Sequence, residues 1–130
     1  MSRLFVLTNH SVTSEQHDDA VANLHVAEIV ELPRELKANF GEVPPEVNSV
    51  ADFVRPYIEW LESQLADGDV VWVQGEWGVT ASVMGWCRVC GVRCVYATTR
   101  REAEEIRMPD GKVNLVHVFK HVRFRDFPRF

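Results

Sequence analysis

The chain has 130 residues, 46% of them apolar, and a formal net charge of −5 at pH 7. This size and composition predict a single globular domain, residues 1–130, with one core and little chain left for a second. No apolar run approaches membrane-spanning length, and Met1-Ser2-Arg3 leads directly into a strand-like segment instead of a signal peptide. We therefore expect a cytoplasmic protein without a membrane partner.

The charge is unevenly distributed along the chain. Residues 1–87 carry 4 basic and 14 acidic side chains, whereas residues 88–130 carry 10 basic and 5 acidic ones. An acidic body with a basic carboxyl-terminal third predicts one electropositive face. Such a face suits a small phosphorylated ligand better than long duplex nucleic acid, which we do not expect as a partner.

Strands and helices alternate in the first half of the chain. Residues 3–8 predict a strand, and Thr13 with Gln16 three residues later is the signature of a capping box at the start of a helix over residues 14–24. On that helix, His17-Asp18-Asp19 are expected to be solvated surface. The further elements predicted before residue 66 are a strand at 26–32, a short helix at 33–40, a proline-containing connector at 41–48 and an amphipathic helix at 49–65, which Pro56 should kink or begin.

Residues 69–80, DVVWVQGEWGVT, are the segment around which the chain is organised. The apolar run from Val70 to Val73 is typical of a strand buried on both faces, and it leads into a glycine-bounded loop and then a helix from about Val79. Ligands of open α/β sheets bind beyond the carboxyl ends of the strands. Residues 74–78 are therefore predicted to form a ligand wall. The alternative is that Gly75 and Gly78 only permit a tight turn.

The predicted fourth strand, residues 92–97, is followed by two hydroxyl and two guanidinium groups. They belong to Thr98, Thr99, Arg100 and Arg101, and we expect them in a loop. In a parallel sheet this position faces the ligand, where guanidinium groups bind phosphate; the alternative is a solvated polar loop.

The carboxyl-terminal part predicts a β-hairpin. Residues 102–107 and 113–119 flank the turn Pro109-Asp110-Gly111. Polar and apolar residues then alternate over residues 120–127, which in a strand places His121, Arg123 and Arg125 on one cationic face.

The three cysteines, Cys87, Cys90 and Cys94, do not complete a metal site. A zinc site would need a second Cys-x-x-Cys or a well-spaced histidine pair, and the sequence has neither. We expect all three to be buried, reduced packing residues, and we predict neither a metal nor a cofactor.

Five stretches carry a family resemblance: the opening strand ending at His10 with Thr13 and Glu15-Gln16 after it, VPPE at 43–46, QGEWGVT at 74–80, ATTRREAEE at 97–105 and HVFKHVRFRDF at 117–127. Together they resemble the CRISPR-associated Csx proteins of the family numbered twenty. That family resembles the CARF group, whose Rossmann-like domains dimerise and hold cyclic oligoadenylate across a two-fold axis. The resemblance implies an α/β, Rossmann-like (CARF-like), mainly parallel sheet flanked by helices, with a carboxyl-terminal β-hairpin.

The resemblance also implies a function, that of a metal-independent ring nuclease working as a homodimer. It would open the cyclic oligoadenylate messenger of type III CRISPR systems, with cyclic tetra-adenylate as the expected ring, and so switch off antiviral signalling. Linear products with 2′,3′-cyclic phosphate ends are expected. One alternative is a sensor or sponge that binds the ring without cutting it; another is an unrelated mononucleotide-binding protein.

Cleavage of an RNA phosphodiester needs an aligned 2′-hydroxyl, a base, an acid and positive charge near the phosphoryl oxygens. We predict His10, His121 and Arg123 as catalytic residues, because their stretches are expected to converge on one face. Trp77 is expected to stack on adenine. The predicted ligand-binding residues are Asn9, Ser11, Gln74, Gly75, Glu76, Trp77, Gly78, Thr98, Thr99, Arg100, Arg101 and Lys120.

Overall fold

The protein is an α/β structure built on one five-stranded sheet, and the computed structural model describes residues 1–130. In chain order the elements are β1 (Arg3–Leu7), α1 (Ser14–Asp19), the π-helix η1 (Ala20–Leu24), β2 (Glu28–Glu31), α2 (Arg34–Phe40), α3 (Ala51–Gln64), β3 (Val70–Val73), α4 (Trp77–Cys90), β4 (Arg93–Arg107) and β5 (Val113–Asp126). The strand order is β2-β1-β3-β4-β5, and only the β4–β5 pair is antiparallel. The predicted α/β class, mainly parallel sheet and carboxyl-terminal hairpin are confirmed.

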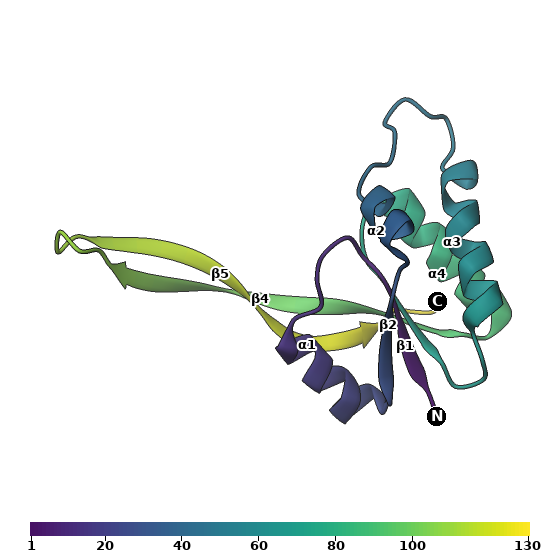
Figure 1. The fold of residues 1–130 in the computed structure, drawn as a ribbon, viewed down its shortest axis with the longest axis horizontal. Coiled ribbons are helices and arrows are strands. Elements are labelled where there is room, and N and C mark those ends of the chain that lie inside the picture. The colour runs from purple at the N-terminus through teal and green to yellow at the C-terminus, as the bar shows by residue number, and fades with distance from the viewer.

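The core lies on both faces of the sheet. Figure 1 shows α1 on one side of the sheet and α3 and α4 on the other. Because successive side chains of a strand point to opposite faces, Phe5 and Leu7 of β1 join the core under α3 and α4, whereas Leu4 and Val6 join the core under α1 and η1. All four residues of β3 are buried, as the uninterrupted apolar run predicted.

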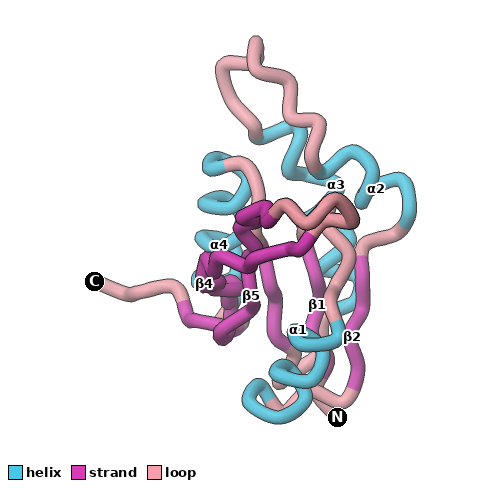
Figure 2. Tube along the Cα trace, turned by 90° about the vertical axis from the view of Figure 1, so that its left-hand side faces the viewer, coloured by secondary structure: helices cyan, strands magenta, loops and turns pink.

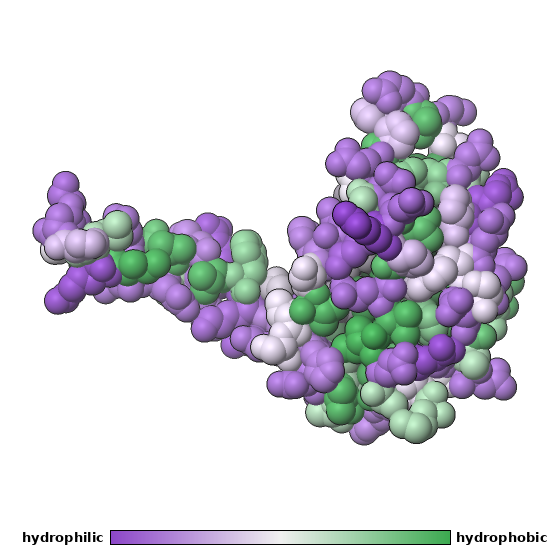
Figure 3. Space-filling model, in the orientation of Figure 1, coloured by the Kyte–Doolittle hydropathy of each residue, from purple (hydrophilic) through white to green (hydrophobic).

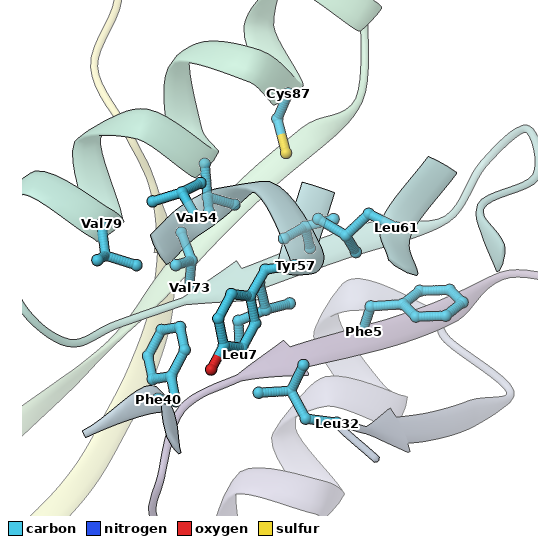
Figure 4. Close-up of a cluster of buried hydrophobic side chains, with 12 residues drawn as sticks. Phe5, Leu7, Leu32, Phe40, Val54, Tyr57, Leu61, Val73, Val79 and Cys87 are labelled. Carbon is cyan, nitrogen blue, oxygen red and sulfur yellow. The ribbon is translucent and has the colours of Figure 1, made fainter. Parts of the chain in front are cut away.

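Aromatic rings fill the larger of the two cores (Figure 4). The ring of Tyr57 on α3 meets Phe40 edge to face at 5.3 Å between ring centroids, and its hydroxyl donates a hydrogen bond of 2.7 Å to the carbonyl of Leu36. Full burial of one such side chain contributes about 1.5–3 kcal/mol. These contacts hold α2 against α3.

The helices begin and end largely as predicted. Thr13 and Gln16 form the reciprocal capping box at the start of α1, and η1 extends the helical segment to Leu24, where His25 adopts φ 57° and ends it. Pro56 lies inside α3 without ending it. None of the helices combines the length and apolar character needed to cross a membrane.

The predicted loop at residues 98–101 is wrong, because these residues continue β4. Pairing of β3 with β4 ends at Trp72 and Val95, whereas β4 and β5 stay paired as far as Arg107 and Val113. The backbone of residues 98–101 therefore finds its hydrogen-bond partners on β5 instead of turning away. We call the projecting part of this hairpin, residues 99–121, the arm; Figure 2 looks along it toward the body.

The three cysteines are free, but they are not all buried. Cys87 is fully buried in the core beneath α4, and Cys94 is half-buried. The pKa of the Cys94 thiol is raised well above its usual range, mainly by a hydrogen bond with Cys87 and next by burial. Cys90 is exposed near the end of α4, so the prediction of burial is wrong for this residue.

Asp69 joins the amino-terminal ends of β1 and β3. Its carboxylate accepts hydrogen bonds from the backbone N–H groups of Arg3 (2.9 Å) and Ala66 (2.8 Å) and from the Arg3 guanidinium (3.0 Å). Burial alone would raise the pKa of this carboxyl, but these hydrogen bonds outweigh burial and hold the pKa below its usual value. The ionised form therefore stabilises the fold.

We predict that Asp69→Ala lowers the free energy of unfolding by about 2–4 kcal/mol, because buried N–H groups lose their acceptor. The matched control is Asp67→Ala, which removes an exposed carboxylate two residues away and should cost less than about 0.5 kcal/mol. Because the folded-state pKa of Asp69 is lowered, its contribution is present above about pH 4 and is lost as the pH falls through that folded-state pKa. Urea unfolding at pH 7 and pH 3 measures both effects; equal losses in the two variants would contradict this account.

Candidate functional site at the carboxyl edge of the sheet

The parallel strands β1 and β3 end side by side at one edge of the sheet. The backbone N–H of Gln74 donates to the carbonyl of Leu7 (3.1 Å), which extends the pairing by one step. Beyond this point the chain leaves β1 through Asn9, His10 and Ser11, which are all exposed. The edge therefore presents the predicted histidine to solvent, next to the loop that follows β3.

The carboxyl end of α2 lies against both of these loops. A Cβ atom added to Gly41 would lie 2.5 Å from Nδ2 of Asn9, and one added to Gly75 would lie 2.7 Å from Cε2 of Phe40. A side chain at position 75 would have to displace the buried Phe40 ring, whereas one at position 41 would displace only the exposed end of the Asn9 side chain. Asn9 thus lies beside the end of α2, and Gly75 is a glycine because the buried ring of Phe40 occupies the adjacent space.

The glycine segment after β3 is shorter than predicted. Helix α4 already begins at Trp77, so Gly78 lies in its first turn and only Gly75 belongs to the loop. The Glu76 carboxylate accepts from the N–H of Gly78, and the Thr80 hydroxyl accepts from the N–H of Gly75 (3.1 Å). Both glycine N–H groups thus already have partners within the chain.

Gln74 has a structural task that the sequence did not indicate. Its side-chain oxygen accepts from the N–H of Ala97 (2.9 Å) and from Nε1 of Trp72 (2.8 Å), and its amide nitrogen donates to the carbonyl of Ala97 (3.1 Å). The side-chain amide therefore stands in for the peptide group that β3 would have offered β4 had it continued. The Gln74 side chain therefore connects β4 to the carboxyl edge, and its oxygen and nitrogen, which were predicted to bind a ligand, form hydrogen bonds within the chain.

An aromatic cavity of about 410 Å³ opens beside this loop. Trp77 stands over it with 91% of its surface exposed, while Tyr96 and Phe127 pack together with their ring centroids 4.8 Å apart. The Arg125 guanidinium covers the outer face of Tyr96 and donates to its hydroxyl (3.2 Å). The cavity is lined by Val73, Gln74, Gly75, Trp77, Thr80, Tyr96, Phe127 and Pro128.

Of the three aromatic residues that line the cavity, Trp77 was predicted from the sequence as a ligand-binding residue, whereas Tyr96 and Phe127 were not. These two residues meet because β5 runs back along β4 and returns the end of the chain to the body. The one available signal was the alternation of residues 120–127, which extends to Phe127. It indicated a strand, but it did not indicate which neighbour that strand would have.

The predicted cationic face is wrong for His121, because a β-bulge interrupts β5. Thr98 pairs with Arg123 and Thr99 with His121, so Val122 is an extra residue and the alternation of side chains is reversed beyond it. His121 therefore packs on the buried ring of Phe124, with 5.0 Å between ring centroids. It does not share a face with Arg125.

His121 is buried and paired, with only 5% of its side chain exposed. Its Nε2 lies 2.6 Å from Oδ2 of Asp19, and its Nδ1 is buried without a partner. Burial would raise the pKa of Asp19, but the hydrogen bonds from Asn23 and His121 outweigh it and keep that pKa below its usual value. Asp19 is thus not the solvated surface residue predicted. The pair fastens the root of the arm to α1.

The remaining predicted residues lie on or beside the arm. Thr98 exchanges two hydrogen bonds with the backbone of Arg123, at 2.8 and 3.2 Å, and so closes the bulge. Thr99 and Lys120 line a second hollow of about 240 Å³ between the arm and α1. Arg100 and Arg101 are the next residues of the arm, and both are exposed.

Lys120 is engaged with acidic neighbours on β4. Its Nζ lies 3.3 Å from Glu104 and 3.9 Å from Glu102, and the hydrogen bond to Glu104 is the main reason that its pKa is raised. No three histidine, cysteine, aspartate or glutamate side chains lie close enough together to hold a metal ion. His10 thus lies exposed in the loop after β1 and the aromatic cavity opens beside the loop after β3, whereas His121 is buried against Asp19.

We predict that Gly75→Ala destabilises the protein by about 1–3 kcal/mol, because the new methyl group would displace the buried Phe40 ring. Gly85→Ala is the matched control: it lies within α4 with no atom near the added Cβ, and it should stabilise the protein by about 0.5–1 kcal/mol. Thermal unfolding of the two variants tests the contact. A stable Gly75→Ala protein would show that Phe40 does not hold this loop.

Comparison with known proteins identifies the family. A family model described as "Uncharacterized protein MJ1673 family" matches residues 2–125. Uncharacterized protein MJ1673 of Methanocaldococcus jannaschii is 35% identical over 127 residues, which cover 98% of each chain. No solved structure matches the chain. Because both matches span nearly the whole sequence, the chain belongs to the MJ1673 family.

Proposed function

We propose that this protein is a cytoplasmic ring nuclease that binds cyclic oligoadenylate, with cyclic tetra-adenylate as its substrate, and ends type III CRISPR antiviral signalling. The observation that carries the proposal is the carboxyl edge of the sheet, where exposed His10 and exposed Trp77 follow neighbouring strands. This is the position at which open α/β sheets bind ligands. The likeness of residues 74–80 and 97–105 to the Csx proteins supports the ring as ligand and a Rossmann-like, CARF-like fold.

Adenine recognition is assigned to the aromatic cavity. Its volume of about 410 Å³ is in the range of small-molecule sites. An indole with 91% of its surface exposed gains nothing from the core and offers a free face for stacking. Base stacking on an aromatic side chain is worth about 1–3 kcal/mol per base, which makes Trp77 the main source of binding energy for adenine.

In the proposed cleavage, a ribose 2′-oxygen of the ring forms a bond to the adjacent phosphorus while the bond from phosphorus to the 5′-oxygen breaks. The 2′-hydroxyl loses its proton, the departing 5′-oxygen gains one, and a 2′,3′-cyclic phosphate remains. His10 is the accessible histidine at this edge and is proposed to transfer a proton. Arg100 and Arg101 are proposed to balance charge on the phosphoryl oxygens.

We assign His121 a positioning role instead of a catalytic one. Its Nε2 is bound to Asp19 and its side chain is buried, so a substrate atom has no access to it. A homodimer is proposed because a ring of four equal units can meet two identical half-sites across a two-fold axis. One ring would then bind per two chains.

A second candidate is a sponge that binds the ring and leaves it intact. The burial of His121 favours it, because the edge then offers one accessible histidine where acid and base catalysis needs two proton-transfer steps. Ring binding is common to both candidates, and only cleavage separates them.

We predict that His10→Ala slows single-turnover cleavage of cyclic tetra-adenylate by about 10²–10⁴-fold while its affinity for the ring falls far less. His17→Ala removes another exposed histidine and should cut at the wild-type rate. Because the substrate supplies its own nucleophile, cleavage should also persist in excess EDTA. Full activity of His10→Ala would remove this residue from the mechanism, and an intact ring after hours with wild-type protein would favour the sponge.

We predict that Trp77→Ala weakens ring binding by about 10–100-fold, the loss expected from one or two stacked bases. Trp77→Phe keeps an aromatic face and should retain most of the affinity. Since Trp77 is exposed, the melting temperatures of both variants should match that of the wild type. Isothermal titration calorimetry provides the affinities, and equal affinity of Trp77→Ala and the wild type would exclude the cavity as the adenine site.

A further inference from the structure

The arm projects from the body with almost no cover from its own chain. Only its root contacts α1, and Figure 3 shows apolar side chains along the rest of it. Leu115 is 62% exposed and Phe119 is 70% exposed. A two-stranded hairpin by itself is marginally stable in water, so a ribbon that exposes large apolar side chains needs a partner surface.

Both faces of the arm carry apolar side chains. Leu115, His117 and Phe119 share one face of β5, and Val116 and Val118, which are half-buried, lie on the other. Apolar residues on one face only would indicate docking onto a flat surface. On both faces they indicate that the arm is enclosed from two sides.

The charge of the arm allows its partner to be a second copy of this chain. The arm carries five basic side chains (Arg100, Arg101, Arg107, Lys112 and Lys120) and four acidic ones (Glu102, Glu104, Glu105 and Asp110), so two arms can approach without net repulsion. Residues 1–87, with 4 basic and 14 acidic side chains, disfavour contact between two bodies. A nearly neutral arm can lie against either surface.

We propose that two copies clasp each other with their arms, each arm lying between the arm and the body of the other copy. One face of a ribbon about 30 Å long and 10 Å wide offers on the order of 300 Å², well below the roughly 800 Å² that each partner buries in a stable interface. Contact between the two arms alone is therefore too small. In the clasp, each chain buries both faces of its own arm and one patch of its body under the other arm. These three areas of about 300 Å² add up to about 900 Å² per chain.

The clasp would also add residues to the proposed ligand site, because it would place the partner's arm beside the carboxyl edge of the sheet. β4 runs parallel to β1 and β3 and leaves the body at their carboxyl ends, so the arm starts at the edge that carries His10. In the clasped pair, the partner copy would supply Arg100 and Arg101 to that edge. This last step rests on the proposed function; the clasp itself does not, since it forms without ligand.

Light scattering of ligand-free protein tests the clasp through substitutions on the arm. Wild-type protein should have twice the chain mass of 14.9 kDa. The double variant Leu115→Lys/Phe119→Lys should have the mass of one chain, because two buried charges on each arm oppose the contact. Val89→Lys, which changes a valine 87% exposed on α4, should stay dimeric. A monomeric wild type, or a double variant that stays dimeric, would overturn the proposal.

Hydrogen exchange of the wild-type chain provides a second test that needs no variant. Backbone amides of residues 100–120 should exchange at least about tenfold more slowly at high than at low protein concentration, because assembly covers both faces of the arm. Exchange in β3 should not depend on concentration. Arm amides with the same exchange rate across the dilution series would reject the clasp. Neither measurement uses a ring, so the clasp and the ring nuclease can fail separately.

Discussion

The shape of the molecule depends on one mismatch in length: β3 ends at Val73, whereas its neighbour β4 continues to Arg107. Beyond Val73 the edge of β4 has lost its partner, and the side-chain amide of Gln74 satisfies the first exposed peptide groups at Ala97. The chain can then turn at Gly75 into α4. The space left beside β4 becomes the aromatic cavity, and the unsupported length of β4 becomes the arm.

This mismatch separates the part of the protein that is stable from the part that is available for binding. Below the edge, β3 is buried on both faces, and Asp69 accepts hydrogen bonds at its start. Above the edge, Trp77 and the arm expose apolar surface that the chain does not use for its own core. The Asp19–His121 pair lies at the boundary and connects the root of the arm to α1.

Local signals predicted the body of the fold well. The run of four apolar residues correctly indicated a strand buried on both faces, and Thr13 with Gln16 correctly marked the start of α1. Residues 98–101 were predicted as a loop, because a polar Thr-Thr-Arg-Arg run is typical of one. They belong to β4 only because they pair with β5, which is distant in the sequence. Burial of His121 depends on a bulge at Val122, which the alternating pattern does not indicate.

The candidate site was predicted in part for the same reason. His10 and Trp77 follow directly from the ends of two strands, so their positions could be inferred from the sequence. Tyr96 and Phe127 are 31 residues apart in the sequence and meet only because β4 and β5 form a hairpin. The pairing of Thr98 with Arg123 depends on the same hairpin. Gln74 and Gly75, which were predicted to bind a ligand, form hydrogen bonds within the chain, and this use of their polar groups was not predicted.

Binding of cyclic tetra-adenylate at the carboxyl edge of the sheet is the proposal on which the assigned function depends. It is tested most directly by following backbone amide signals in nuclear magnetic resonance spectra while a ring with methylated 2′-hydroxyls, which cannot be cleaved, is added. We expect the largest changes in residues 9–11 and 75–77 and at the root of the arm. Changes confined to the opposite edge around Asp69, or no changes at saturating ring, would contradict it.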